Sequence, residues 1–451
     1  MLSVPCAHPG IARRRRRQLP HIRRTRQIDV SRSFNRPAPP EPRLSLMSAT
    51  SMTVTREQAL RYRWRATGLD AEPGDAVLPE LAALDLGVQE GANAAGVIGL
   101  VNRGVTPAEA IRCTSGFTEE LALAWTVRGA PQYIRRRDLA DVEVAVSPFS
   151  DRDASKRVLL ADRDFAAAAV EARDGMRVVA TAMREALADA AVDAGATGES
   201  ARMSKGELSG RLTATLPRPY LVDCRPCRAT HPQEQLFRIC ALHAGVELEP
   251  GTNPPRLRIA PEWPERPVGP EDDPSSAPAA LQVIRAYLHL LGPASPRDVA
   301  AFLETNVGEV KPRWPDDVRE VEIDGHRASM LAADLDALAA AADAPAPRDA
   351  AVRLLSGFDL LLAAKDRERL VSDPIRRKQL WPVLGRPGVV AVDGDPVGVW
   401  RPRSKGKALT VRVELWGGSG SGRARHIDAI DTQAERIAQA RDQRLSRVEI
   451  A

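Results

Sequence analysis

The chain has 451 residues, of which 43% are hydrophobic and 27% charged, so it has enough apolar side chains for packed cores, and wholesale disorder is excluded. No stretch approaches the run of about 18 apolar residues that a membrane-spanning helix needs, and five cysteines in so long a chain exclude a small disulfide scaffold. The net charge of +5 is uneven, because residues 1–50 carry eleven arginines against Asp29 and Glu41, a net +9, which leaves −4 for residues 51–451.

Residues 1–50 combine arginine runs with scattered prolines and show no apolar periodicity. Such a segment cannot bury enough surface to offset chain entropy, so we expect it to be disordered. Four explanations fit this composition: a start assigned too early, with Met47 or Met52 as the first residue, a basic arm that contacts phosphates, a transit peptide, or an inert tail.

The next two segments, residues 51–150 and 151–260, are predicted to be mainly helical. Thr55 precedes Gln58 with the spacing of a capping box, and Thr106 before Pro107 predicts the start of another helix. Residues 121–127 have the composition of a strand or a buried helix.

Further along, residues 151–192 are alanine-rich and predict helix, interrupted at Asp174-Gly175. Ser204 is expected to cap a helix that runs toward Leu216, residues 220–222 predict a short strand, and residues 232–242 predict another helix. The proline-rich stretch from Pro250 to Pro278 predicts a linker, with residues 261–278 as the boundary between domains.

Residues 279–345 show the clearest pattern. A first helix with one apolar stripe ends at Gly292-Pro293, Ser295-Pro296 starts a second, and Asn306 is expected to cap a third that runs to Lys311. Residues 318–331 then alternate around Asp324-Gly325, a hairpin signal. Three helices followed by a hairpin is the winged-helix order, whose third helix enters the DNA major groove. The alternative is a generic small α+β unit.

Residues 346–416 change to β character. Residues 389–392 lead into Asp393-Gly394 and return through residues 397–400, and residues 409–415 alternate as a strand with one buried face. We expect a small β-barrel-like domain here. Residues 417–451 predict a Gly/Ser linker and a polar helix over residues 431–445. The fold class predicted overall is α+β, mostly helical.

Several motifs occur together and in one order over residues 55–416: Leu86-Gly87-Val88-Gln89, Trp125-Thr126-Val127-Arg128-Gly129-Ala130-Pro131, Cys224-Arg225-Pro226-Cys227 with Thr230-His231, and Leu380-Trp381-Pro382-Val383-Leu384-Gly385. They resemble the winged-helix DNA-binding proteins related to the bacterial interstrand-crosslink DNA glycosylases. The resemblance implies tandem winged-helix units and a C-terminal β-barrel around a DNA-binding cradle. The first two units, residues 51–150 and 151–260, rest mainly on it.

The resemblance also implies catalytic positions. The glycosylases use a Gln-hydrophobic-Gln or Gln-hydrophobic-Asp motif that positions water at an alkylated purine nucleotide, and the matching residues here are Gln89, Glu90 and Gly91. Gln89 and Glu90 are therefore the candidate catalytic residues. Gly91 has no side chain for chemistry, a neighbour on a strand points to the opposite face, and Gln132 stands where the family pattern leads us to expect histidine.

The candidate DNA-binding residues are basic side chains in elements expected to face the duplex. We predict four groups: Arg135, Arg136 and Arg137; Lys311 and Arg313 at the end of the recognition helix; Arg376, Arg377 and Lys378; and Arg401, Arg403, Lys405 and Lys407 in a Ser/Gly loop after a strand. A single basic run is more often a solvated face, so the prediction depends on several runs lying in the DNA-facing elements of one fold. Acidic neighbours, among them Asp366 and Glu368, dilute the field, so we expect modest, salt-dependent affinity.

No cofactor is expected. Cys224, Cys227 and His231 have the residue types of a zinc site, but the spacing after the pair is irregular. Reduced buried thiols or a polar turn are therefore the main interpretation, and a metal is the alternative. The sequence leaves three functions open: duplex DNA binding linked to damage recognition, a glycosylase for alkylated purines, and a protein-interaction scaffold. The expected partner is double-stranded DNA, with no membrane, and the expected location is the cytoplasm, at the nucleoid if bacterial.

Overall fold

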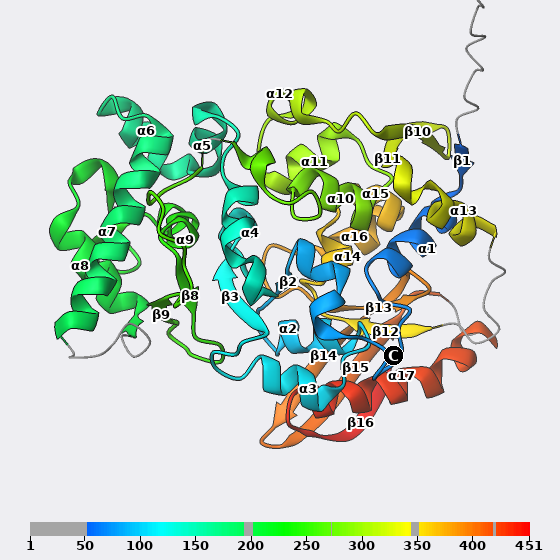
Figure 1. Cartoon of the computed structure of the whole chain (residues 1–451). Helices are drawn as coiled ribbons and strands as arrows, with labels where there is room; N and C mark the ends of the chain where they lie inside the picture. The colour runs from blue at the N-terminus through cyan, green and yellow to red at the C-terminus, as the bar shows by residue number, and fades with distance from the viewer. Residues whose placement is uncertain (1–51, 194–201, 272, 344–350, 418–420) are drawn as a thin grey trace, which may run out of the picture. The chain divides into compact units, whose positions relative to one another are not determined.

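The computed structural model describes residues 52–193, 202–271, 273–343, 351–417 and 421–451 (Figure 1). These residues belong to one of the two contact units into which the chain divides, residues 50–451. The arginine-rich segment 1–50 falls outside the described residues. Within them the fold mixes helices with four β-sheets. None of these helices has both the length and the hydropathy needed to cross a bilayer.

The largest sheet has six strands in the order β2-β4-β3-β8-β9-β5. All five residues of β3 are buried, so the stretch predicted as strand or buried helix is a strand. The strands in chain order are β2 (Val88–Gln89), β3 (Leu121–Trp125), β4 (Pro131–Arg135), β5 (Met203–Ser204), β8 (Val246–Leu248) and β9 (Arg256–Ile259). Because β9 pairs with both β5 and β8, the linker predicted from Pro250 begins with part of this sheet.

Two helices of this half begin where the capping signals predict. The Thr106 side chain accepts a hydrogen bond from the Glu109 backbone N–H, and Ser204 forms a full capping box with Glu207. The helices are α2 (Ala95–Val101), α3 (Pro107–Cys113), α4 (Leu139–Val146), α5 (Asp151–Arg157), α6 (Leu159–Ala167), α7 (Ala172–Asp193), α8 (Lys205–Thr215) and α9 (Glu234–His243). A separate hairpin of β6 (Leu221–Cys224) and β7 (Ala229–Pro232) connects α8 to α9.

The break predicted at Asp174-Gly175 is wrong. Both residues lie inside α7, and the interruption falls at residues 168–171. A Cβ at Gly175 would come within 2.5 Å of the Phe165 ring. The glycine is therefore needed for close packing between α6 and α7, and it does not end a helix.

The segment around the predicted recognition helix has the expected order of elements: α10 (Val283–Leu291), α11 (Pro296–Leu303), α12 (Val307–Val310), β10 (Val318–Ile323) and β11 (His326–Leu331). Asp324 and Gly325 both have positive φ, 48° and 79°, as a two-residue hairpin turn requires. As expected, the third helix is short: α12 ends at Val310, one residue before Lys311, and Pro312 follows, which lacks the N–H that would continue the helix. Asn306 stands at its N-cap position, but its side chain makes no capping hydrogen bond.

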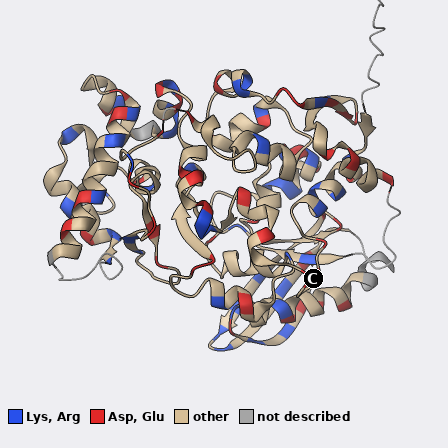
Figure 2. Ribbon diagram, viewed as in Figure 1, with Lys and Arg blue, Asp and Glu red and all other residues tan. Residues whose placement is uncertain are grey.

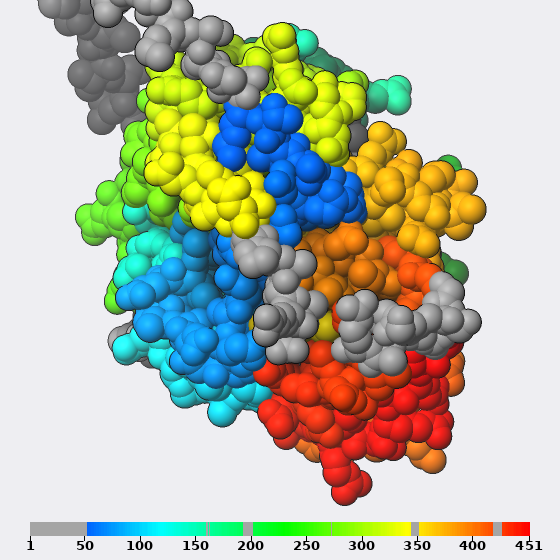
Figure 3. Space-filling view, turned by 90° about the vertical axis from the view of Figure 1, so that its right-hand side faces the viewer, coloured from blue at the N-terminus to red at the C-terminus, as the bar shows by residue number. Residues whose placement is uncertain are grey.

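The N-terminus of the described part joins this segment. The strand β1 (Met52–Val54) pairs in parallel with β10, and α1 (Arg56–Ala66) carries the predicted capping box between Thr55 and Gln58. A further helix, α13 (Leu335–Asp343), follows the hairpin. In the space-filling view α1, in blue, lies between the yellow residues of the hairpin and α13 and the orange residues of the C-terminal sheet (Figure 3).

The C-terminal part is a curled five-stranded sheet in the order β12-β13-β14-β15-β16. Its strands are β12 (Val352–Leu355), β13 (Gly388–Val392), β14 (Asp395–Lys405), β15 (Ala408–Leu415) and β16 (Arg444–Ile450). The helices of this part are α14 (Leu360–Ala363), α15 (Arg367–Leu370), α16 (Pro374–Leu380) and α17 (Ser421–Ala440).

The predicted helix over residues 431–445 is wrong at its end. The helix α17 stops at Ala440, Asp442 has a left-handed φ of 51°, and β16 then pairs in parallel with β15. The side chains of Leu445, Val448 and Ile450 pack against the core. The last residues are therefore part of the sheet, which extends beyond residue 416.

Candidate functional site: a cationic cavity beside Gln89

A cavity of about 320 Å³ is lined by residues from the six-stranded sheet, α9, the end of α11 and the segment from Gly357 to Arg367. Two side-chain amides, those of Gln89 and Gln235, line the cavity together with four basic side chains, those of Arg128, Lys365, Arg367 and Arg386. The Gln235 amide already donates to the Arg128 carbonyl at 3.2 Å. The acidic residues of the lining are Glu304 and Asp359. The cavity therefore combines two amides with an excess of positive charge.

The position of Gln89 is fixed by the pairing of β2 with β4. Gln89 lies directly opposite Gln132, so both side chains point to the same face of the sheet. The Thr126 hydroxyl donates to Oε1 of Gln132, which holds that amide in the sheet. Gly87 has φ of +84°, and a Cβ there would lie 2.9 Å from the Gln132 Cβ. The glycine of the Leu86–Gln89 motif therefore makes room for Gln132 next to Gln89.

The side-chain amide of Gln89 has no hydrogen-bond partner among the residues that the structure describes. A half-buried amide without a protein partner is available to a ligand or to water. Gln89 is thus an uncharged polar group in the cavity that is free to hold a water molecule.

Arg128 owes its position to the tight connection between β3 and β4. It adopts a left-handed φ of 63°, and the Gly129 N–H donates to the Thr126 carbonyl at 2.9 Å. Non-glycine residues held in this region concentrate at functional sites. The Arg128 guanidinium donates to the Phe302 carbonyl at 2.8 Å and lies 4.9 Å from the centre of that ring. Burial, with a further contribution from Arg386, lowers the pKa of Arg128.

Lys365 is the second basic residue of the cavity. Its backbone N–H donates to the Tyr287 hydroxyl at 3.2 Å, whereas its ammonium group has no hydrogen bond or ion pair within the described part of the chain. Burial is the main cause that lowers the pKa of Lys365 to about 8, and the nearby charges of Arg128 and Arg367 add to it. The fold therefore holds a partly desolvated cation next to other cations, an arrangement that favours an anion in the cavity.

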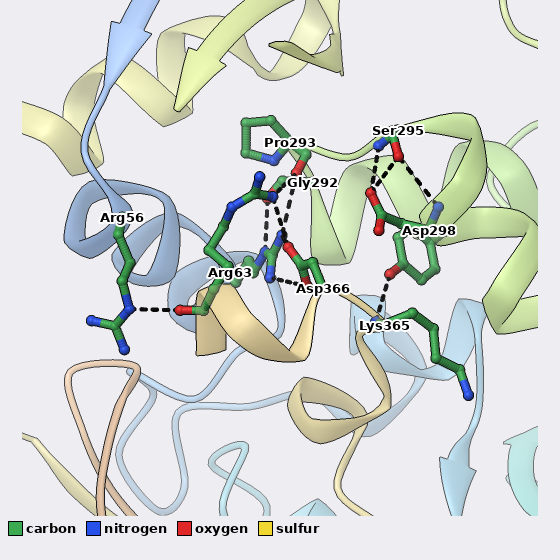
Figure 4. A network of polar contacts seen from close by, with 10 residues as sticks. Arg56, Arg63, Gly292, Pro293, Ser295, Asp298, Lys365 and Asp366 are labelled. Carbon is green, nitrogen blue, oxygen red and sulfur yellow. Dashed lines mark hydrogen bonds and ion pairs between the residues drawn. The ribbon is translucent and has the colours of Figure 1, made fainter. Parts of the chain in front are cut away.

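The residue after Lys365 points elsewhere. Asp366 lies 2.6 Å from Arg63 and 2.7 Å from Arg369, and Figure 4 shows the Lys365 side chain extending away from the Arg63–Asp366 pair. Burial raises the pKa of Asp366, but the charges of Arg63 and Arg369 outweigh burial and hold this pKa below its ordinary value. Asp366 therefore does not neutralise the cavity, contrary to the expectation that it would dilute the positive field.

The other two cations rest on aromatic rings. The Arg367 guanidinium lies 4.9 Å from the centre of the Trp381 ring, and that of Arg386 lies 5.4 Å from the centre of the Phe358 ring. Neither forms an ion pair with a described residue. Ring faces hold a guanidinium in place without neutralising it, so both charges remain available.

The acidic lining residues do not cancel this charge. Asp359 forms a bidentate pair with Arg103, with N–O distances of 2.9 and 3.0 Å, and both side chains are fully buried. Glu304 lies 3.9 Å from Arg128, and 57% of its side chain is exposed to solvent. One carboxylate is thus committed to an internal pair and the other makes a loose, solvated contact.

Glu90, the second candidate catalytic residue, is not brought to the cavity. Its carboxylate accepts hydrogen bonds from the backbone N–H groups of Gly91 and Gly96, at 2.9 and 3.2 Å, near the start of α2. Burial raises the pKa of Glu90. Glu90 does not line the cavity that holds Gln89, and a catalytic role for Glu90 stays a prediction that these contacts do not favour.

The predicted basic group at the end of β4, Arg135 to Arg137, contains two residues that pair inside the fold and one that is exposed. Arg135 lies 2.7 Å from Asp85 and 3.0 Å from Asp138, and Arg136 lies 2.9 Å from Glu247. Both guanidinium groups act inside the fold, which corrects the prediction that they contact DNA. The side chain of Arg137 is 68% exposed, and a DNA-binding role for it stays a prediction.

The second and third groups are also partly used by the fold. Arg313 donates to the carbonyls of Glu309 and Phe149 at 2.8 Å, whereas Lys311 is exposed. Arg377 donates to the carbonyls of Val371 and Ser372, at 2.8 and 2.6 Å. The remaining two are Arg376, which lies 3.4 Å from Asp373, and the exposed Lys378.

The last basic group lies on the β14–β15 hairpin and not in a loop as predicted. Arg401, Arg403 and Lys405 belong to β14, and Lys407 follows the turn, paired with Asp442. Figure 2 shows basic residues gathered on this hairpin. All four are exposed.

None of the four cavity cations was among the predicted DNA-binding residues. Arg128 stands inside a motif and Arg386 directly follows one, and this is the signal that could have identified them. Lys365 and Arg367 alternate with acids in the sequence, which is typical of a solvated face. Their common orientation becomes visible only in three dimensions.

A cavity lined by an excess of positive charge concentrates anions, as a protein that acts on a polyanion requires. The sequence model of the AlkZ-like DNA glycosylases matches residues 85–440. The chain belongs to this family of DNA glycosylases, whose substrate is DNA. Of the three functions that the sequence leaves open, this supports the DNA-repair glycosylase over binding alone.

The fold agrees with this assignment. The chain is similar to the DNA glycosylase AlkZ of Streptomyces sahachiroi, with a TM-score of 0.62 and 20% sequence identity over 89% of this chain and 100% of that chain. No curated protein matches the sequence.

Proposed function

We propose that this DNA glycosylase hydrolyses the N-glycosidic bond of an alkylated purine, with Gln89 orienting the water and the cavity cations holding the neighbouring phosphates. The observation that carries the proposal is the Gln89 amide, which has no partner in the described part of the chain and shares its cavity with Arg128, Lys365, Arg367 and Arg386.

The chemistry fits an amide better than a carboxylate pair. A purine alkylated at N7 is cationic, so the electron pair of the breaking C1′–N9 bond passes to a base that is already primed to leave. The oxygen of water forms the new bond to C1′ and its proton passes to solvent, so the protein has to position the water, which a carbonyl oxygen such as Oε1 of Gln89 does by accepting its hydrogen bond. A strong general base is not required for such a leaving group.

The basic side chains supply the affinity. A base has to leave the stack to be hydrolysed, and phosphate contacts on either side hold the strand in that conformation. Contact of all four cavity cations with phosphates gives log K against log salt a slope of about −3.6 on duplex DNA. The exposed residues that stay candidates for further phosphate contacts are Arg137, Lys311, Lys378, Arg401, Arg403, Lys405 and Lys407.

We further propose that the substrate is duplex DNA and that the protein acts in the cytoplasm; the support for the substrate is the family, whose members act on DNA. Tandem winged-helix units over residues 51–150, 151–260 and 279–345, followed by a barrel-like domain from residue 346, remain the proposed architecture. The order of α10, α11, α12 and the β10–β11 hairpin supports the third unit, and the first two rest on the family resemblance.

The test is incubation of the full chain with a duplex that carries N7-methylguanine, followed by detection of abasic sites. We expect abasic sites in the alkylated duplex and none in the unmodified one. Gln439, an exposed residue of α17, offers a matched control for Gln89: Gln439→Ala should behave as the wild-type protein. Absence of abasic sites with any alkylated purine would overturn the proposal.

A further inference from the structure

The β6–β7 hairpin brings two cysteines and a histidine together, far along the chain from Gln89. In its register Cys224 pairs with Ala229, and Val222 pairs with His231. Side chains two residues apart on a strand share a face, and so do directly opposed residues. Cys224 and His231 therefore lie on the same face of the hairpin, as diagonal neighbours.

The third residue comes from the turn. Cys227 lies in the segment between the strands, where Arg228 takes a left-handed φ of 52°, and the Cys227 backbone N–H forms a hydrogen bond to the Cys224 sulfur. The two sulfur atoms and one imidazole nitrogen all lie within 4.8 Å of one another. Ligand atoms around a tetrahedral zinc ion are about 3.8 Å apart for two sulfurs, so small side-chain rotations bring the three to bonding distance.

The histidine is held in the tautomer that a metal requires. Its Nδ1 lies 2.7 Å from the Pro232 carbonyl oxygen, which can only accept, so Nδ1 carries the proton and Nε2 carries the lone pair. Nε2 is buried without a well-formed hydrogen bond among the described residues, and the Cys224 thiol is the side chain in contact with the His231 ring. A backbone carbonyl that fixes the second ring nitrogen is the usual support of a metal-bound histidine.

We propose that Cys224, Cys227 and His231 bind a zinc ion. Two thiolates and one imidazole suit Zn²⁺ and exclude the oxygen-preferring Mg²⁺ and Ca²⁺. No fourth His, Cys, Asp or Glu completes this group within the described residues, so the fourth position belongs to solvent. The spacing of these residues in the sequence is irregular for a zinc site, but the hairpin explains it, because the chain reverses and places His231 next to Cys224.

The ion has a structural consequence for the cavity. His231 is followed within three residues by α9, whose Gln235 donates to the Arg128 carbonyl at 3.2 Å. A metal that closes the hairpin fixes the entry of the chain into α9, and thereby one wall of the cationic cavity. The site lies outside the catalytic machinery, so it orders that wall and takes no part in bond cleavage.

The test uses the full chain, purified with reductant, stripped with a chelator and then given Zn²⁺ alone. Elemental analysis after removal of free metal should find one zinc per chain in the wild-type protein and none in Cys224→Ser, Cys227→Ser or His231→Ala. Two matched controls should keep the metal: Cys6→Ser, in the part of the chain outside the described residues, and His326→Ala, an exposed histidine of β11.

A second measurement does not depend on how the variants fold. Titration of the stripped wild-type protein with Co²⁺ should give the absorption of a thiolate-to-cobalt charge transfer, displaced by Zn²⁺. Wild-type protein that holds no more zinc than Cys224→Ser would overturn the proposal, as would a cobalt complex without that absorption, or a Cys224–Cys227 disulfide in the reduced preparation.

Discussion

Replacement of Lys365 by glutamine should have two opposite effects: weaker DNA binding and a more stable fold. The ammonium group is one of four unneutralised cations, so its loss should remove one phosphate contact and reduce the slope of log K against log salt by about 0.9. Over a roughly fourfold rise in salt, the wild-type protein should therefore lose about 3.5 times more affinity for duplex DNA than Lys365→Gln does.

The pKa of Lys365 gives the sign of two further effects. Burial lowers it from 10.5 to about 8 in the folded chain, so the affinity for DNA should fall as pH rises through about 8 in the wild-type protein only. Between these two values the unfolded chain binds more protons than the folded one, so the stability of the wild-type protein should rise with pH in that window. Below it the charged lysine opposes folding, and Lys365→Gln should have the higher Tm at pH 7.

Fluorescence anisotropy across salt and pH measures the affinity, and thermal unfolding measures Tm. Lys156→Gln, at an exposed lysine of α5, is the matched control and should change neither. An unchanged salt slope together with a lower Tm in Lys365→Gln would show that the ammonium group stabilises the fold and does not bind phosphate.

Three other predictions follow from the contacts of single residues. Glu90→Gln should keep base excision close to the wild-type rate but lower the free energy of unfolding, measured in urea, by about 1–3 kcal/mol, because the Glu90 carboxylate accepts two backbone hydrogen bonds. Loss of excision without loss of stability would show that Glu90 takes part in catalysis. Arg135→Ala should lower the stability by about 3–5 kcal/mol, because the carboxylates of Asp85 and Asp138 lose their cationic partner. The slope of log K for DNA binding against log salt should not change, and a reduced slope in a stable variant would contradict this. Gly175→Ala should lower stability by about 1–3 kcal/mol, since its Cβ would meet Phe165 at 2.5 Å, and a neutral or stabilising effect would show that α6 and α7 separate easily.

Local signals in the sequence predict the starts of elements well. Thr55, Thr106, Ser204 and Ser295 all cap helices where their side chains predict it, because the cap is a contact between residues three apart. The turn at Asp324-Gly325 follows for the same reason. Errors occur where tertiary packing overrides such signals, as at Gly175 within α7.

In the functional site, too, a local motif predicts one residue, whereas tertiary packing decides the positions of the others. Gln89 was predicted from a motif and lies in the cavity, whereas its neighbour Glu90 does not line it. The motifs point to Arg128 and Arg386, but Lys365 and Arg367 could not be predicted, because a sequence does not state which charges are neutralised. Arg135 and Arg136 stand in a basic run but pair with carboxylates inside the fold, the half-buried Asp85 and the buried Glu247. Lys365 stands beside Asp366, which points away from the cavity and pairs with Arg63.

The most direct test of the catalytic role of Gln89 is the single-turnover rate of N7-methylguanine release from an alkylated duplex that is fully bound by the protein. This rate is compared between Gln89→Ala and Gln439→Ala. We predict that Gln89→Ala releases the base at least about 100-fold more slowly, with unchanged DNA affinity, because only the oriented water is lost. Release at the wild-type rate by Gln89→Ala would contradict the account and place the catalytic group elsewhere in the chain.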